Sequence, residues 1–220
     1  DLEKVKNNVR VMRELTDRGN CELGLVTKSF CADPEIVKAI DSVGIDFFAD
    51  ARIQNLESYK EIKTPKMLLR LPQHCEIEKV VSFADMSLNS ELSTIKLLDQ
   101  EAAKQGKTHK VVLMIDLGDL REGIFFRDED VIMSTVEEIL KLKNIKLHGV
   151  GVNLTCYGAV IPKQDNLSTL VEIAGKIESR FNIKLDMISG GNSSSIYLID
   201  REGLPEGINS LRIGEAFILG

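Results

Sequence analysis

Several features that mark common protein classes are missing from this sequence of 220 residues. Basic residues are in the minority, with 28 Lys and Arg against 34 Asp and Glu, which gives a formal net charge of −6. Without a basic cluster, neither nucleic acid nor an anionic membrane is expected as a partner. No apolar run approaches the ~18–20 residues needed to span a bilayer, so no membrane span is expected either.

Paired cysteines and a targeting segment are also missing. Cys21, Cys31, Cys75 and Cys156 are widely scattered and form no C-x-x-C pair. We therefore expect neither a metal site nor a disulfide framework. The chain begins at Asp1, with neither a Met nor a signal-like segment, which favours a cytoplasmic protein and is consistent with a trimmed chain.

Short apolar runs alternate with longer amphipathic segments along the chain. Most of the short runs are nearly continuous in apolar residues, as expected of parallel strands that are covered on both faces. Strands are predicted at residues 23–27, 45–48, 66–69, 86–88, 110–115, 147–152, 185–188 and 210–213. Helices are predicted at residues 2–16, 90–103, 128–142 and 166–181, and another is expected to open at residues 33–35 (DPE).

Eight strands that alternate with helices predict a (β/α)8 TIM barrel that occupies residues 1–220 as one domain. An open doubly wound sheet is the alternative. The phosphate-binding fingerprint of that fold, G-x-G-x-x-G after the first strand, is absent from the sequence. The barrel is therefore the favoured fold.

Polar and charged residues concentrate at the carboxyl ends of the predicted strands, where barrel enzymes place their chemistry. Residues 189–195 (SGGNSSS) follow the seventh strand, and residues 211–215 (LRIGE) contain the end of the eighth. Glycines let backbone N–H groups approach an anion, and barrels commonly bind phosphate after these two strands. The segment is therefore a candidate phosphate site, with a plain connecting turn as the alternative.

Lys28 closes the first predicted strand, which is otherwise apolar. A lysine at the mouth of a barrel is either a surface residue with a buried stem or an amine that reacts with a carbonyl group. A phosphate site in the same barrel favours the second interpretation. Lys28 would then form a Schiff base with a phosphorylated aldehyde.

Six segments, taken together, resemble the N-terminal barrel domain of the alanine racemase family, and most of all its ornithine racemase-like branch. They are residues 1–5 (DLEKV) with Asn8, 26–28 (VTK), 116–123 (DLGDLREG), 153–158 (NLTCYG), 189–193 (SGGNS) and 211–214 (LRIG). The resemblance implies a pyridoxal phosphate (PLP) barrel of fold type III. It implies an amino-acid racemase that takes a small-molecule substrate and is a homodimer in its full-length form.

The resemblance also assigns roles to individual residues. Lys28 would hold PLP and act as the base on one face of the substrate Cα, with Arg212 at the pyridine nitrogen and Arg121 near the phenolic oxygen. Phosphate contacts would come from Ser189, Gly190, Gly191, Asn192, Ser193 and Gly214, and the ring would be lined by Asn153 and Cys156, with Cys156 and Tyr157 as further catalytic candidates. Structural alternatives remain: Arg121 could pair with Asp116, Asp119 or Glu122, and Arg212 with Glu215 or Asp186.

A racemase needs an acid/base group on each face of the substrate. In alanine racemases the second group is a tyrosine of the partner's C-terminal β-domain, and no such domain is present in this chain. The branch resemblance suggests a basic substrate such as ornithine, otherwise alanine, with the side-chain ammonium meeting Asp50, Asp119 or Glu215. The alternatives are a non-catalytic PLP-binding protein of cofactor homeostasis and a phosphate-sugar isomerase or aldolase.

Overall fold

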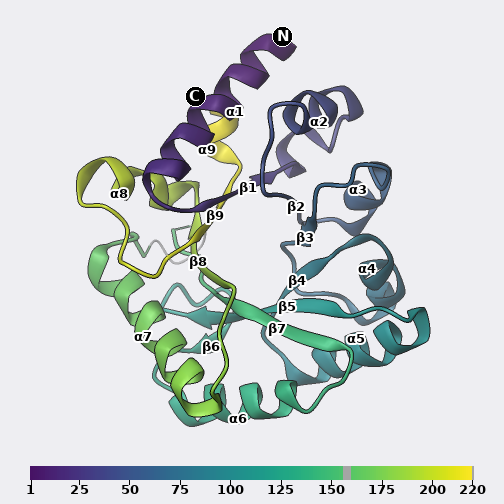
Figure 1. Ribbon diagram of the computed structural model, residues 1–220, viewed down its shortest axis with the longest axis vertical. Coiled ribbons are helices and arrows are strands. Elements are labelled where there is room, and N and C mark those ends of the chain that lie inside the picture. Colours follow the sequence, from purple (N-terminus) through teal and green to yellow (C-terminus); the bar gives the residue numbers. More distant parts are fainter. Residues whose placement is uncertain (156–159, 220) are drawn as a thin grey trace.

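Parallel strands close into a barrel in the computed structural model, which describes residues 1–155 and 160–219 (Figure 1). The wall runs β1-β2-β3-β4-β5-β7-β8-β9 and closes because β9 pairs with β1 and β4 with β5. Its strands are β1 (Glu22–Val26), β2 (Phe47–Asp50), β3 (Lys66–Leu68), β4 (Met86–Asn89), β5 (His109–Asp116), β7 (Ile145–Gly151), β8 (Met187–Asn192) and β9 (Ser210–Ile213). A two-residue strand, β6 (Ile124–Phe125), pairs with the carboxyl end of β5. The predicted barrel is confirmed.

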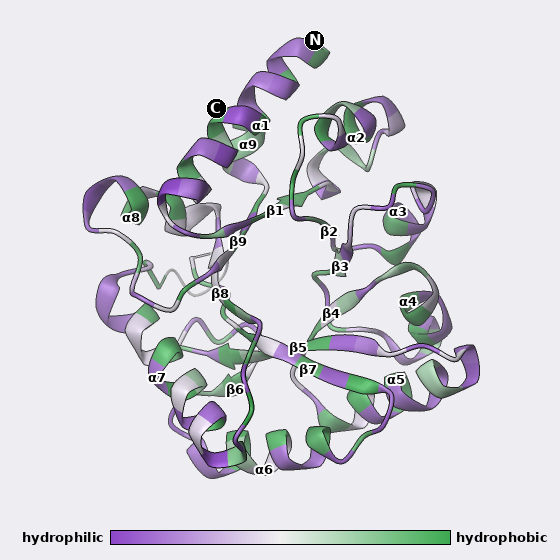
Figure 2. Cartoon of the chain, viewed as in Figure 1, coloured by the Kyte–Doolittle hydropathy of each residue, from purple (hydrophilic) through white to green (hydrophobic). Residues whose placement is uncertain are grey.

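Helices surround this wall and turn their apolar sides toward it (Figure 2). They are α1 (Leu2–Arg18), α2 (Pro34–Asp41), α3 (Ile53–Ser58), α4 (Ile77–Phe83), α5 (Leu92–Gln105), α6 (Glu129–Leu140), α7 (Gln164–Phe181), α8 (Ile196–Arg201) and α9 (Glu215–Leu219), with short 3₁₀ helices η1 (Lys28–Phe30), η2 (His74–Glu76) and η3 (Ser193–Ser195). Helix α2 begins as predicted, because the Asp33 carboxylate accepts from the Glu35 and Ile36 amides. Within the described residues, every helix is too short or too polar to cross a membrane.

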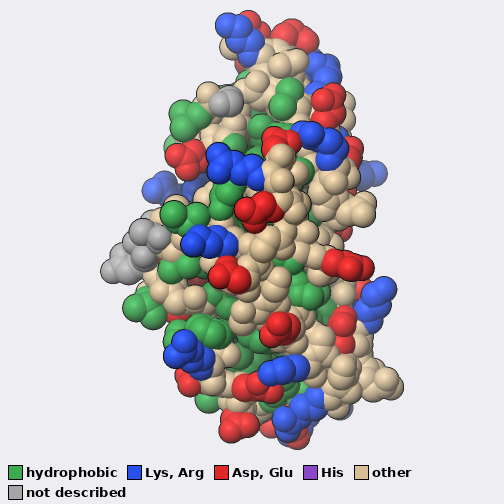
Figure 3. Space-filling model, turned by 90° about the vertical axis from the view of Figure 1, so that its left-hand side faces the viewer, with side chains coloured by type: hydrophobic (Ala, Val, Ile, Leu, Met, Phe, Trp, Pro, Cys, Tyr) green, Lys and Arg blue, Asp and Glu red, His purple; other side chains and the backbone are tan. Residues whose placement is uncertain are grey.

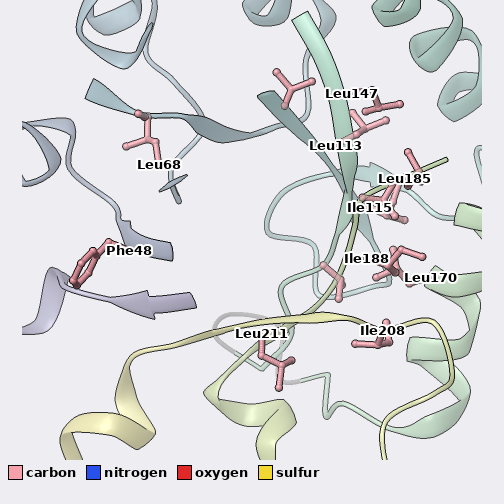
Figure 4. Close-up of a cluster of buried hydrophobic side chains, with 14 of the residues drawn as sticks. Phe48, Leu68, Leu113, Ile115, Leu147, Leu170, Leu185, Ile188, Ile208 and Leu211 are labelled. Atoms are coloured by element: carbon pink, nitrogen blue, oxygen red, sulfur yellow. The ribbon is translucent and has the colours of Figure 1, made fainter. Parts of the chain in front are cut away.

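Two apolar layers follow from the alternation of side chains along each strand. The outer layer lies between strands and helices and includes Phe48, Leu113, Ile188 and Leu211 (Figure 4). The inner layer fills the barrel and is rich in methionine: it comprises Val26, Phe47, Ala49, Met67, Met86, Leu88, Val112, Met114 and Met187. Methionine suits such an irregular interior because its side chain is flexible. The barrel interior is thus a packed core on which a site can rest.

The seventh wall strand differs most from its predicted range. It was expected at residues 185–188, but β8 runs from Met187 to Asn192 and so includes the first four residues of the SGGNSSS segment. Ser189 pairs with both Gly151 and Ser210, and the register shifts before Asn192 pairs with Arg212. Gly191 accommodates this irregularity with a φ of +109°. The two glycines therefore shape a strand rather than a loop.

Candidate active site

A cavity of about 400 Å³ opens at the carboxyl ends of the strands, within the ~300–1,000 Å³ typical of small-molecule sites. Its described lining consists of Val26, Lys28, Ala51, Leu69, Arg70, Arg121, Glu122, Asn153, Asn192, Ser193, Arg212, Gly214 and Glu215. Seven residues predicted to be catalytic or to bind the cofactor are in this set, namely Lys28, Arg121, Asn153, Asn192, Ser193, Arg212 and Gly214, and so is Glu215, which was predicted to meet a substrate ammonium. The fold thus brings together side chains from five separate segments.

Lys28 is placed by the end of strand β1. The preceding residue, Thr27, is buried, and its hydroxyl donates to the Asp50 carboxylate at 2.6 Å. Asp50 also accepts from the Asn55 amide and from the backbone N–H of Arg52. This anchored strand end presents Lys28 to the cavity. Asp50 itself is fully buried and outside the cavity lining, so it fixes the strand end and does not face a substrate ammonium.

Arg212 lies at the base of the cavity and is 2% exposed. Its guanidinium donates to the Ser189 hydroxyl, to the Val152 carbonyl oxygen at 2.7 Å and to Asn153 Oδ1 at 2.8 Å. Gly151 leaves room for it, because a Cβ there would lie 3.4 Å from one of its terminal nitrogens. Asp186, one of the two alternative partners considered for Arg212, lies instead with Lys146, at 2.6 Å.

The SGGNSSS segment divides between the barrel wall and the cavity. Ser189, Gly190 and Gly191 are buried in strand β8, and Ser189 contacts Arg212, whereas Asn192 and Ser193 line the cavity. At the adjacent end of β9, the backbone N–H groups of Gly214 and Ala216 both donate to Ser193 Oγ, at 3.1 and 3.2 Å. Two backbone amides and a hydroxyl thus gather at one place beside the cavity, and backbone N–H groups and hydroxyls are the donors from which proteins build anion sites.

The loop after strand β5 carries Arg121 into the cavity. The Asp116 carboxylate accepts from the Gly118 and Leu120 amides, at 2.8 and 3.1 Å, and so closes the turn. Arg121 pairs with Glu122, with 3.3 Å between Nε and Oε2, and both side chains line the cavity. The structural alternative for Arg121, a pairing with a nearby carboxylate, is present at Glu122, and Arg121 lines the cavity as well.

Of the three carboxylates proposed to meet a substrate ammonium, Glu215 lines the cavity. Asp119 is buried and accepts from the Thr155 and Val160 amides, which ties the loop after β5 to the loop after β7. Cys156 and Tyr157, predicted as catalytic, lie outside the described residues. Glu122 was not predicted as a site residue, and Arg70 was not predicted to bind a ligand although it follows β3 at the same face.

Comparison with known proteins points to one family. The family model described as alanine racemase, N-terminal domain, matches residues 1–219. The whole chain is 54% identical to an ornithine racemase of Acetoanaerobium sticklandii and 34% identical to a lysine racemase of Thermotoga maritima. It spans 62% and 61% of the lengths of these two relatives.

Solved structures share the fold at low sequence identity. An alanine racemase of Clostridium difficile 630 superposes with a TM-score of 0.76 at 19% identity, over 96% of this chain and 56% of the other. A protein of unknown function from Bifidobacterium adolescentis gives a TM-score of 0.79 at 17% identity, over 98% and 95%. The match to the family model over nearly the whole chain shows that the protein belongs to the alanine racemase N-terminal domain family, whose cofactor is PLP.

Proposed function

We propose that this chain is the PLP-binding barrel of an amino-acid racemase that acts on a basic amino acid such as ornithine, with alanine as the other candidate substrate. One observation carries the proposal: one cavity, at the carboxyl ends of the barrel strands, is lined by Lys28, Arg121, Arg212, Ser193 and Gly214. The names of the two curated relatives, an ornithine and a lysine racemase, support a basic substrate.

The residues present fit the cofactor by their chemistry. PLP offers a phosphate, an aldehyde and a ring nitrogen, and the cavity holds a matching group for each. Ser193 with the Gly214 and Ala216 amides suits the phosphate, Lys28 supplies a primary amine for the aldehyde, and Arg212 supplies a donor for the ring nitrogen. When bound, PLP withdraws electrons from the amino acid attached to it and so acidifies the Cα–H bond.

The side chains of this chain have distinct tasks in the proposed reaction. Lys28 Nζ holds the cofactor covalently and then removes or returns the proton at one face of the substrate Cα. Arg212 keeps its proton under all ordinary conditions, so it can only donate to the ring nitrogen. Arg212 would thereby keep that nitrogen unprotonated and so restrict side reactions such as transamination. Arg121 places a positive charge where the substrate and the phenolic oxygen carry negative charge.

Racemisation also needs an acid/base group on the opposite face. A tyrosine from a C-terminal β-domain of a partner subunit is the candidate for this task, and Cys156 and Tyr157 stay catalytic candidates without an assigned face. Residues 1–220 would then be one domain of a longer homodimeric enzyme. Glu215, at the edge of the cavity, is the candidate partner of the substrate's distal ammonium.

The test is an absorption spectrum of the purified full-length protein with added PLP, followed by borohydride trapping. We expect a band near ~420 nm in the wild type and none in Lys28→Ala, because the amine that holds the aldehyde is gone. Lys60→Ala is the matched control, because Lys60 lines a different cavity at the other end of the barrel. A wild type that gives no such band would contradict the cofactor assignment.

Racemisation of ornithine, lysine and alanine is then followed by chiral chromatography. We expect turnover of ornithine and a loss of about 1,000-fold or more in Lys28→Ala. Turnover of alanine alone would contradict the basic substrate. PLP binding without racemisation of any of the three would contradict the racemase and favour the non-catalytic protein of cofactor homeostasis.

A further inference from the structure

A continuous series of polar contacts joins the two arginines of the cavity. Arg121 Nε lies 3.3 Å from Glu122 Oε2, and the other oxygen of Glu122 accepts from Asn153 Nδ2. Asn153 Oδ1 in turn accepts from Arg212 at 2.8 Å. The four residues come from three separate segments: the loop after β5, the loop after β7 and strand β9.

The chemistry of the two neighbours of Asn153, Arg212 and Glu122, determines the orientation of its side-chain amide. A guanidinium can only donate hydrogen bonds, and a carboxylate can only accept them. Asn153 must therefore turn its oxygen toward Arg212 and its nitrogen toward Glu122, and the opposite orientation would break both contacts. Asparagine meets this demand because it has one donating and one accepting end.

Glu122 is held rigidly in place. Gly123, the next residue, has a φ of +117°, and a Cβ there would lie 2.6 Å from the backbone nitrogen of Asp116. Strand β6 then pairs with the end of β5, so the chain that follows Glu122 is fixed. The Glu122 side chain is only 12% exposed, which limits solvent screening of its charge.

We propose that Glu122 is a positioning residue that couples Arg121 and Arg212 through Asn153. Its carboxylate contacts the Arg121 guanidinium directly, helps to orient that of Arg212 through Asn153, and offsets part of the positive charge of the two. This inference rests on the proposed function, in which the two arginines serve two different polar atoms of one cofactor ring. Glu122 acts through its neighbours and takes no proton from the substrate.

A double-mutant cycle on the full-length protein tests the coupling. Glu122→Ala and Asn153→Ala are each expected to weaken PLP binding about tenfold, measured by absorbance titration. The double variant is expected to bind no more weakly than the weaker single variant, because either change breaks the same path. Additive losses, or wild-type affinity in Glu122→Ala, would overturn the proposal.

Glu122→Gln gives a second readout in a variant of unchanged shape. The amide oxygen can still accept from Asn153, but the negative charge is lost. We expect the pH midpoint of the bound cofactor's absorption to fall, because a protonated, positively charged group loses a nearby carboxylate. An unchanged midpoint would contradict a role for this charge.

The control is Glu129→Gln, which removes a carboxylate from the exposed pair with Lys176 on the surface. It should match the wild type in affinity and in midpoint. The wild-type spectrum distinguishes a failure of the proposed function from a failure of the role proposed for Glu122. If the wild type and Lys28→Ala behave as expected while the cycle is additive, the proposed function stands and the role of Glu122 is wrong.

Discussion

Both ends of the barrel carry a cationic cavity, yet the two are built differently. The cavity at the carboxyl end measures about 400 Å³, and one at the amino end measures about 460 Å³ and is lined by Lys60, Lys66, Lys107 and Lys110. At the amino end, Lys66 donates to the backbone oxygens of Ile62 and Thr64, and Lys107 to those of Val81 and Ser82. Lys66 and Lys107 therefore serve to satisfy backbone carbonyl groups in the loop after helix α3 and at the end of helix α4.

At the carboxyl end, the charged groups contact one another and converge on the cavity. Arg212 donates to Asn153, Asn153 donates to Glu122, and Arg121 pairs with Glu122. Charges of both signs are also interspersed over the face of the molecule shown in Figure 3. Volume and positive charge therefore do not distinguish a site from a structural feature. The atoms that each cation contacts make that distinction.

The largest expected effect is a loss of stability on substituting Gly149 of strand β7, and Gly151 of the same strand provides the comparison. A Cβ at Gly149 would lie 1.8 Å from the backbone oxygen of Met187, which begins β8. Gly149→Ala must therefore separate two paired strands, and we expect a loss of ~3 kcal/mol or more in the free energy of unfolding, measured in urea.

Gly151→Ala, at the carboxyl end, is the matched variant. Its Cβ would lie 3.3–3.4 Å from side-chain atoms of Val112, Met114 and Arg212, which can shift. We expect a loss of only ~1 kcal/mol in stability but a several-fold weaker affinity for PLP, because Arg212 moves. Equal stability losses in the two variants would remove the distinction between a wall glycine and a site glycine.

The next largest effect is a pH dependence of the free energy of unfolding, caused by His109 at the amino end of the barrel. His109 is 2% exposed, contacts the Ser87 hydroxyl at 2.8 Å, and has its pKa lowered to about 4, chiefly by burial. The unfolded chain therefore binds a proton more readily, and stability that is complete above pH ~6.5 is lost as the pH falls toward 4.

This titration should cost ~2 kcal/mol of unfolding free energy between pH 7 and pH 5. His109→Gln is expected to be less stable at pH 7 and to lack this part of the pH dependence, as measured by urea unfolding at both values. His74→Gln, at an exposed position, should keep the wild-type slope. A slope unchanged by His109→Gln would show that other groups carry the acid sensitivity.

The wall strands could be predicted because short continuous apolar runs, alternating with longer amphipathic segments, are typical of strands buried on both faces. Helices α3 and α4 were missed because they are only six and seven residues long and lack a side-chain cap at the amino end. Strand β8 was predicted too short because glycines are typical of turns, and only pairing with both neighbours shows that Gly190 and Gly191 belong to the wall.

The residues of the site also differ in whether the sequence alone could predict them. Lys28 and Arg212 could be predicted because each lies at the end of a predicted strand, where position alone indicates exposure to the cavity. Glu122 could not, because its partner Asn153 is 31 residues away and no local pattern reports that contact. Asp50 has a similar strand-end position, yet Thr27, Arg52 and Asn55 use its oxygens. Strand ends identify candidates, and the three-dimensional contacts select among them.

The smallest expected effect concerns a lysine of the amino-end cavity. Lys107 Nζ donates to the Val81 and Ser82 carbonyl oxygens, at 3.0 and 3.2 Å, in the last turn of α4. Lys107→Met removes a cation from a helix C-terminus, which is worth ~0.5 kcal/mol of unfolding free energy. Affinity for PLP should stay unchanged, because these contacts stop at the backbone of one helix. If absorbance titration showed that Lys107→Met weakens PLP binding, the amino-end lysines would be linked to the site, and the functional difference between the two cavities would not hold.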